Sequence, residues 1–181
     1  MSALASLLRE RGRDVTLYNP DPAPRYLRWL PHIDTLTRHT GAPHQLTVVV
    51  DCGDQKLLGK SFPAREITGP ILCLDHHATS RPFGDHNLVD SSAASVGVLV
   101  ARLAAHLDWP LSKDAGTAIF VSLVSDTGSF RYANSNAEAF QLGARLVADV
   151  GVEPWTVNQH LSEEVPLARY RLLATALGGI V

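Results

Sequence analysis

Two short apolar runs, each ending abruptly in acidic or histidine residues, constrain the fold of this chain more than any other feature. The first run, Leu46–Val50, is followed at once by Asp51, and the second, Ile71–Leu74, by Asp75–His77. Continuous aliphatic runs of this length, rich in β-branched residues, are typical of strands buried on both faces in a parallel sheet. Each run therefore predicts a buried strand whose carboxyl end carries polar side chains.

The remainder of the chain is predicted to be mostly helical. Strands alternate with helical segments in the first half and helices follow in the second, which indicates an α/β fold. We expect an open, mostly parallel β-sheet flanked by helices, with a helical C-terminal half and a loop over 81–90. The other expected elements are a strand at 15–18, a helix that Ser91 or Ser92 caps and that carries 96–107, and helices at 3–11, 113–124, 137–150, 155–161 and 166–177.

Composition argues against several classes of protein. The 181 residues carry a formal net charge of -2, and Lys and Arg are scattered, so the footprint of a long-duplex binder is missing. Apolar stretches fall short of the about 20 residues that a membrane span needs, and the N-terminus lacks the pattern of a signal peptide. We therefore expect a cytoplasmic location and no membrane partner. Cys52 and Cys73 lack CxxC spacing, which predicts neither a disulfide framework nor a thiolate zinc site.

The polar residues after the two strands indicate a metal centre. Ligands of open parallel sheets bind outside the carboxyl ends of the strands, where Asp51 and Asp75–His77 are expected. A single aspartate at a strand end would ordinarily be a turn former or a helix cap. Two such ends, one with paired histidines, crowd charges that a cation would compensate. Carboxylate and imidazole ligands without thiolates favour Mn²⁺ or Mg²⁺, with Zn²⁺, Fe²⁺ or Co²⁺ as alternatives.

A two-metal centre of this kind would hydrolyse phosphoesters without a protein nucleophile. Two ions about 3.5–4 Å apart can hold a hydroxide for in-line attack while they neutralise the phosphoryl oxygens. The sequence agrees, because it has no GxSxG elbow, no glycine-rich P-loop and no GxGxxG after a strand.

Three motifs in order resemble the DHH phosphoesterase family. They are Val48–Asp51, Leu74–His77 and Ser125–Arg131. The sequence around them, at 15–22, 83–85 and 126–132, is most similar to the bacterial nanoRNase/pAp phosphatase branch of that family. The tripeptide Asp-His-His alone is a weak signal, whereas three motifs in the family's order and at compatible spacing make a strong one.

The resemblance implies a role for each matching residue. Asp51 would be the metal-bridging carboxylate, and His76 and Asp126 would be ligands of the same metal. His77 would be a second-sphere or phosphate-contacting residue.

Two further residues receive roles from the same resemblance. Asp75 would orient the histidines, because a ligating imidazole usually gives its other N–H to a carboxylate or a carbonyl. Arg131 is a candidate phosphate contact, with a surface salt bridge as the alternative. Mn²⁺ is the expected metal, with Mg²⁺ or Co²⁺ as alternatives.

The sequence also departs from the family. The family begins with a strand that leads into a His and an Asp-x-Asp motif, and it usually carries a C-terminal domain with a glycine-rich His motif; neither is found here. We expect a single truncated catalytic domain over 1–181, with 152–181 as a helical connector towards an absent C-terminal domain. The two-metal site would be incomplete and activity impaired. A missing strand would leave an unpaired sheet edge, which makes a homo-oligomer an expectation as well.

The function implied is a metal-dependent phosphoesterase that hydrolyses short oligoribonucleotides, dinucleotides or 3′-phosphoadenosine 5′-phosphate by a metal-bound hydroxide. The expected partners are therefore short RNA oligonucleotides or nucleotides, without long duplex nucleic acid. A RecJ-like single-strand exonuclease and an exopolyphosphatase are alternative enzymes that share these motifs. A non-catalytic nucleotide-binding or interaction fragment is the alternative from another class.

Overall fold

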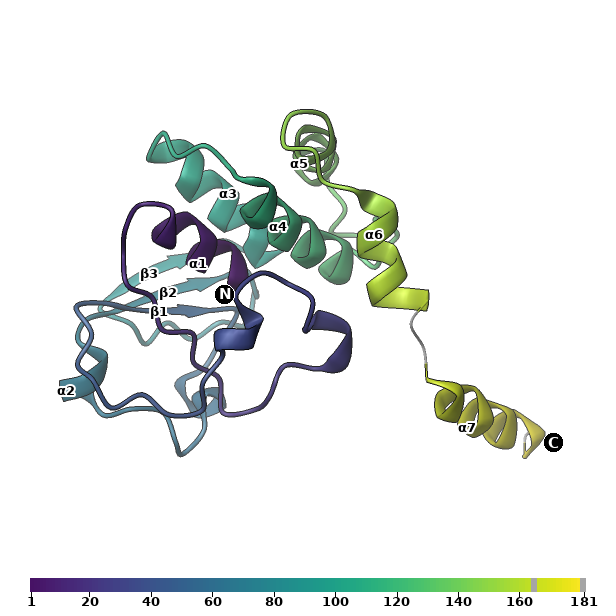
Figure 1. Cartoon of the computed structure of the whole chain (residues 1–181), viewed down its shortest axis with the longest axis horizontal. Coiled ribbons are helices and arrows are strands. Elements are labelled where there is room, and N and C mark those ends of the chain that lie inside the picture. The colour runs from purple at the N-terminus through teal and green to yellow at the C-terminus, as the bar shows by residue number, and fades with distance from the viewer. Residues whose placement is uncertain (164–165, 180–181) are drawn as a thin grey trace.

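A parallel sheet of three strands in the order β1-β2-β3 is the scaffold of the molecule. The structure is a computed structural model, and it describes residues 1–163 and 166–179. The strands are β1 (Thr47–Val50), β2 (Ile71–Asp75) and β3 (His86–Val89). Helices lie over one face of the sheet and extend beyond it (Figure 1). The expected α/β fold, with a parallel sheet and a helical second half, is confirmed.

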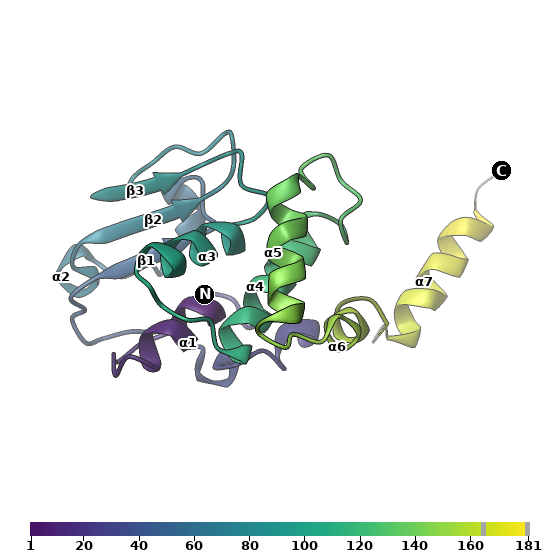
Figure 2. The same ribbon diagram turned by 90° about the horizontal axis from the view of Figure 1, so that it is seen from above.

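Seven α-helices accompany this sheet in the described part of the chain. A layer of α1, α3 and α4 packs on one face, α5 and α6 pack against α4, and α7 stands away from the rest (Figures 1 and 2). Side chains cap the starts of α4 and α5: Ser112 accepts from the Ala115 N–H, and Asn136 accepts from the Ala139 N–H. The bounds are α1 Ser2–Arg9, α2 Arg65–Thr68, α3 Val96–His106, α4 Lys113–Asp126, α5 Ala137–Ala148, α6 Pro154–Asn158 and α7 Leu167–Gly178, with short 3-10 helices at Arg25–Leu27, Ile33–Thr35 and Gln55–Leu58 and a π-helical turn at Gln159–Glu163.

β1 and β2 bury apolar side chains on both faces, as expected for a parallel sheet, whereas β3 is largely exposed. Because side chains alternate along a strand, Leu74 joins the core formed with α1, α3, α4 and α5. Val49, Ile71 and Cys73 face the other side, where Phe62 packs against them. The helical layer therefore fixes the sheet from one side, and the loops around α2 close the other.

Four local predictions were wrong. No strand forms at 15–18, where Tyr18 makes one isolated parallel bridge with Thr37. The expected loop over 81–90 contains β3, which pairs with β2 through Leu74 and Leu88. Two helix bounds also differ: the helix expected to end at 124 continues to Asp126, and the helix expected to follow a cap at Ser91 or Ser92 begins at Val96. Pairing partners and helix packing decided these points, and neither is visible in a local pattern.

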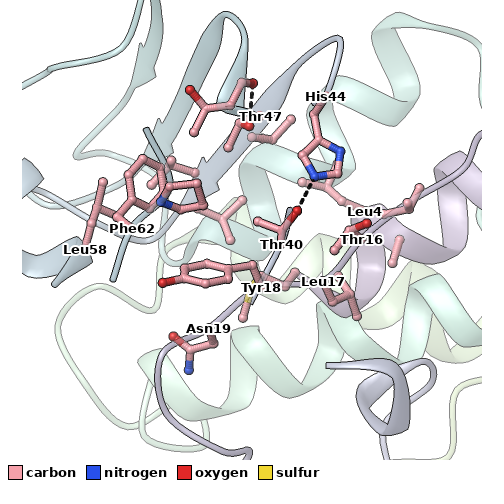
Figure 3. A pocket seen from close by; sticks show the side chains of 18 of the residues that line it. Leu4, Thr16, Leu17, Tyr18, Asn19, Thr40, His44, Thr47, Leu58 and Phe62 are labelled. Atoms are coloured by element: carbon pink, nitrogen blue, oxygen red, sulfur yellow. Dashed lines mark hydrogen bonds between the residues drawn. The ribbon is translucent and has the colours of Figure 1, made fainter. Parts of the chain in front are cut away.

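A cavity runs along the free edge of β1. Among the strands that the structure describes, β1 pairs with β2 only, through bonds such as that from the Thr47 N–H to the Pro70 carbonyl. On its other side lies a cavity of about 380 Å³, walled in part by residues 14–20 (Figure 3). Tyr18 and Phe62 meet edge to face there, with ring centroids 6.1 Å apart. The edge is therefore flanked by a segment of chain that does not pair with it.

The last helix contributes nothing to the core. Every residue of α7 is exposed, including Leu172 at 71%. The expected connector over 152–181 includes 164–165 and 180–181, which lie outside the described residues, and its role stays a prediction. Within the part of the chain that the structure describes, no helix has both the length and the hydropathy needed to cross a membrane.

Candidate metal centre

The polar residues of the three motifs meet at the carboxyl ends of β1 and β2. Asp51 follows β1 directly, and its N–H continues the ladder by donating to the Leu74 carbonyl at 2.9 Å. Asp75 ends β2, and the two histidines follow it. Asp126 is the last residue of α4. Asp51 has a left-handed φ of 58°, a conformation that costs a non-glycine residue about 1–2 kcal/mol and so occurs where the surroundings impose it.

Four side chains bring donor atoms close together. His76 Nε2 lies 3.4 Å from Asp51 Oδ1 and 3.7 Å from Asp126 Oδ2. Ligand atoms of Asp51, His76 and His77 all lie within 4.8 Å of one another. Nitrogen and oxygen ligands at about 2.0–2.2 Å from one metal lie about 3–3.5 Å apart, so the observed separations need little contraction. The donor set therefore fits a divalent cation.

Asp75 is the buried anchor of the histidine pair. Its carboxylate, with the residue 0% exposed, accepts from His77 Nδ1 at 2.8 Å and from the His76 N–H at 2.9 Å, both on Oδ1. Burial disfavours the charge of Asp75, but these hydrogen bonds outweigh it and the pKa of the carboxyl is lowered. The bond from Asp75 raises the pKa of the His77 imidazole. Asp75 thereby fixes the orientation of the His77 ring through Nδ1.

His76 is oriented by the main chain. Its Nδ1 lies 3.2 Å from the carbonyl of Ala93, which favours the tautomer with the proton on Nδ1. The lone pair of Nε2 then points toward Asp51 and Asp126, as it does in imidazoles that bind a metal.

The surroundings of Asp126 disfavour its charged form. Its pKa is raised to about 6, first because the carboxylate is partly buried and second because Asp51 is near. Two carboxylates facing one imidazole are poorly compensated by the protein alone, and a cation would remove the repulsion.

The structure brings together the predicted Asp51, Asp75, His76, His77 and Asp126. It gives Arg131 a different contact, because its Nε donates to the Gly128 carbonyl at 2.7 Å. No ion pair between described residues includes Arg131, so the alternative of a surface salt bridge finds no partner there.

Sequence reasoning missed two groups that hold the site. The Ala93 carbonyl is a main-chain group without a sequence signal. The Asn134 side chain donates to the carbonyls of Ala94 and Asp126. The only signal for the role of Asn134 in the sequence was its position as a polar residue shortly after the Asp126 motif.

Several curated relatives of this chain share one name. The chain is 28% identical over 153 residues to the bifunctional oligoribonuclease and PAP phosphatase NrnA of Bacillus subtilis, covering 80% of this chain and 46% of the relative. It is 28% identical over 165 residues to the protein of that name from Thermus thermophilus, covering 88% and 48%. The resemblance to the DHH phosphoesterases is confirmed. The chain spans about half the length of these relatives.

A solved structure supports the fold independently. The chain superimposes with a TM-score of 0.85 on the crystal structure of an exopolyphosphatase-related protein from Bacteroides fragilis, over 98% of this chain and 55% of that one. The sequence identity is 20%, so the likeness concerns the fold. No model of a known protein family matches the chain.

Proposed function

We propose that this chain carries the metal site of a phosphoesterase that hydrolyses short oligoribonucleotides, dinucleotides or 3′-phosphoadenosine 5′-phosphate. The observation that carries the proposal is the convergence of Asp51 and Asp126 on His76 Nε2, at 3.4 and 3.7 Å. The relatives support it, because their names describe an oligoribonuclease and PAP phosphatase.

The proposed roles follow from the contacts of each side chain. Asp51, His76 and Asp126 would hold the metal, which we propose to be Mn²⁺, with Mg²⁺ or Co²⁺ as alternatives that carboxylate and imidazole also accept. A bound divalent ion supplies Lewis acidity toward the phosphoryl oxygen and acidifies water. His77, whose ring is held by Asp75, would contact a phosphoryl oxygen or lie in the second sphere of the metal.

The choice of short substrates rests on surface charge as well. The net charge is -2 and the cations form no run, whereas binders of long single strands present a basic groove along the backbone. A phosphate of a short substrate would depend on the metal, on His77 and on Arg131, which stays a candidate contact.

The test is release of mononucleotides from a diribonucleotide with and without Mn²⁺. We expect manganese-dependent hydrolysis that Asp51→Asn reduces about a hundredfold or more, because a bridging or ligating carboxylate is lost. Asp54→Asn is the matched control: it lies in the same loop, where its side chain accepts from the Lys56 N–H, and should keep the wild-type rate. Equal rates for Asp51→Asn and wild type would overturn the proposal.

The same assay distinguishes substrates. We expect dinucleotides or 3′-phosphoadenosine 5′-phosphate to be consumed faster than long single-stranded DNA or inorganic polyphosphate. A preference for the long strand or for polyphosphate would replace the proposed substrate class and leave the metal site in place.

A further inference from the structure

Asn134 links two separate supports of the candidate metal centre. Its Nδ2 donates to the Ala94 carbonyl at 3.0 Å and to the Asp126 carbonyl at 3.1 Å. The carbonyl of the preceding residue, Ala93, accepts from His76 Nδ1. A primary amide has two protons to donate, so Asn134 can hold both carbonyls at once. One side chain thus ties the segment that orients the His76 ring to the end of the helix that presents Asp126.

The chain reaches back to Asp126 through a turn that is costly to form. Gly128, Ser129 and Phe130 have φ values of 57°, 60° and 63°, which is three successive left-handed residues, two of them not glycine. Such a turn persists only where its surroundings hold it. The Phe130 ring stacks on Phe140 of α5, with centroids 5.1 Å apart, and anchors the turn. The anchored turn places Asn134 against the helix end that it has just left.

A neighbouring asparagine already serves as the helix cap. Asn136 Oδ1 accepts from the Ala139 N–H at 3.0 Å at the start of α5, and its Nδ2 donates to the Ser92 carbonyl at 2.9 Å. Capping therefore does not explain Asn134, whose contacts run to the two segments beside the donor atoms.

We propose that Asn134 is a positioning residue that sets the separation between His76 Nε2 and the Asp126 carboxylate for metal binding. The inference rests on the proposed function. Two groups on separate segments, 3.7 Å apart, must both stay within reach of one ion. The Gly97 N–H donates to Ser122 Oγ between α3 and α4, so the two helices stay packed without the amide bridge, but the 93–94 segment and the last residue of α4 lose the two hydrogen bonds that fix their separation. Partners that orient metal ligands typically affect metal affinity by about 10- to 100-fold.

The experiment compares the same substitution at both asparagines. Asn134→Asp removes the two donations to Ala94 and Asp126, and Asn136→Asp removes the donation to Ser92 while keeping an oxygen to cap α5. Mn²⁺ affinity is measured by calorimetry, and the ring nitrogens of His76 are observed by NMR in the metal-free protein. We expect Asn134→Asp to weaken Mn²⁺ binding about tenfold or more and to mix the two His76 tautomers. Asn136→Asp should change neither.

The two measurements separate this inference from the proposed function. If the wild-type protein binds no Mn²⁺, the proposed function fails, and the His76 tautomer still decides the role of Asn134. Wild-type affinity and an unchanged tautomer in Asn134→Asp would overturn the inference. Should that variant not fold, Asn134→Ser replaces it, because a hydroxyl donates only one proton and can hold one carbonyl. A Ser variant indistinguishable from Asn136→Asp in both measurements would overturn the inference equally.

Discussion

The charged side chains of the candidate centre differ in what they contribute to the stability of the metal-free protein. Asp126 is the clearest case, because partial burial and the nearby Asp51 raise its pKa to about 6. Asp75 is the opposite case, since its hydrogen bonds to the histidines lower its pKa despite burial. The Asp126 carboxylate therefore costs the metal-free fold stability, whereas the Asp75 carboxylate stabilises it.

Replacing Asp126 should stabilise the metal-free protein. The folded pKa of Asp126 lies above its unfolded pKa, so this carboxyl lowers the stability of the protein as the pH rises from the unfolded pKa through the folded pKa of about 6. The loss of stability is complete at about pH 8. We expect Asp126→Asn to raise the free energy of unfolding by about 1 kcal/mol at about pH 8, with no gain at about pH 4. Urea unfolding at the two pH values measures this, and Mn²⁺ binding should be lost in the same variant. A gain that is equal at both pH values would contradict the electrostatic explanation.

The pair of Asp75 and His77 predicts a pH window. Asp75 contributes stability above its unfolded pKa of about 3.9, and this is lost as the pH falls through its lowered folded value. The stability that His77 contributes is fully present below its unfolded pKa of about 6.5, and it is lost as the pH rises through its raised folded pKa. The pair thus stabilises most between about pH 4 and 6.5.

Asp75→Asn should remove this window. We expect the free energy of unfolding to fall by about 2 kcal/mol at about pH 5.5, because a hydrogen bond between charged groups disappears from a buried position. The decrease should be smaller at about pH 9. NMR titration of His77 should show its pKa falling toward the ordinary value. An unchanged His77 titration would show that Asp75 does not hold the ring.

At the scale of elements, the site depends on how segments end. The carboxyl ends of β1 and β2 lie side by side in a parallel register, Val50 opposite Leu74, which places Asp51 near the histidines. The end of α4 is brought there by packing of α4 on α1 and α3. The left-handed turn that follows α4 then returns the chain to the site. Each element supplies one or two donor groups, so none of them forms the centre alone.

The turn after α4 requires glycine at its first left-handed position. A Cβ at Gly128 would meet the ring of Tyr132, but that side chain is exposed and can move away, so the main cost of a substitution is the strain of a φ of 57°. We expect Gly128→Ala to lower the free energy of unfolding by about 1–2 kcal/mol. Gly12→Ala is the matched control, because Gly12 has a φ of 70° but open space around it and should cost only about 1 kcal/mol. Similar losses in thermal or urea unfolding are expected, and a loss more than about 2 kcal/mol larger in Gly128→Ala would show that the Tyr132 ring cannot move away.

For the whole molecule, the core and the site occupy residues before α7. The buried apolar cluster joins the sheet to α1, α3, α4 and α5, whereas α7 buries no residue and stands apart (Figure 2). A lone helix of 12 residues is marginally stable in water, so α7 cannot stabilise the domain by itself.

Removing α7 should therefore leave the domain intact. We expect a chain of residues 1–165 to melt within about 2 °C of the full chain, because α7 buries no side chain and about 1 kcal/mol of stability is needed to shift the midpoint by several degrees. Its Mn²⁺ affinity should be unchanged. A drop of about 10 °C or more in the calorimetric midpoint would show that α7 packs on the domain in solution.

The amino-acid sequence by itself determined the elements that depend on local pattern. The aliphatic runs before Asp51 and Asp75 specified two buried strands, because a strand buried on both faces needs an unbroken apolar run. Parallel strand ends then predicted that Asp51 and the histidines would meet. The helices from 96 onward followed from apolar periodicity with caps and glycines at their ends.

Only the tertiary structure decided the rest. β3 has no apolar run, because it is largely exposed, and it forms because β2 offers an edge for pairing. Residues 15–18 have the pattern of a strand, but their pairing is limited to the single bridge between Tyr18 and Thr37. The distance between His76 and Asp126, and the reach of Asn134 to both supports, depend on helix packing and on a left-handed turn. These contacts join segments distant in the chain, and a local pattern of residue types does not encode which distant segments will meet.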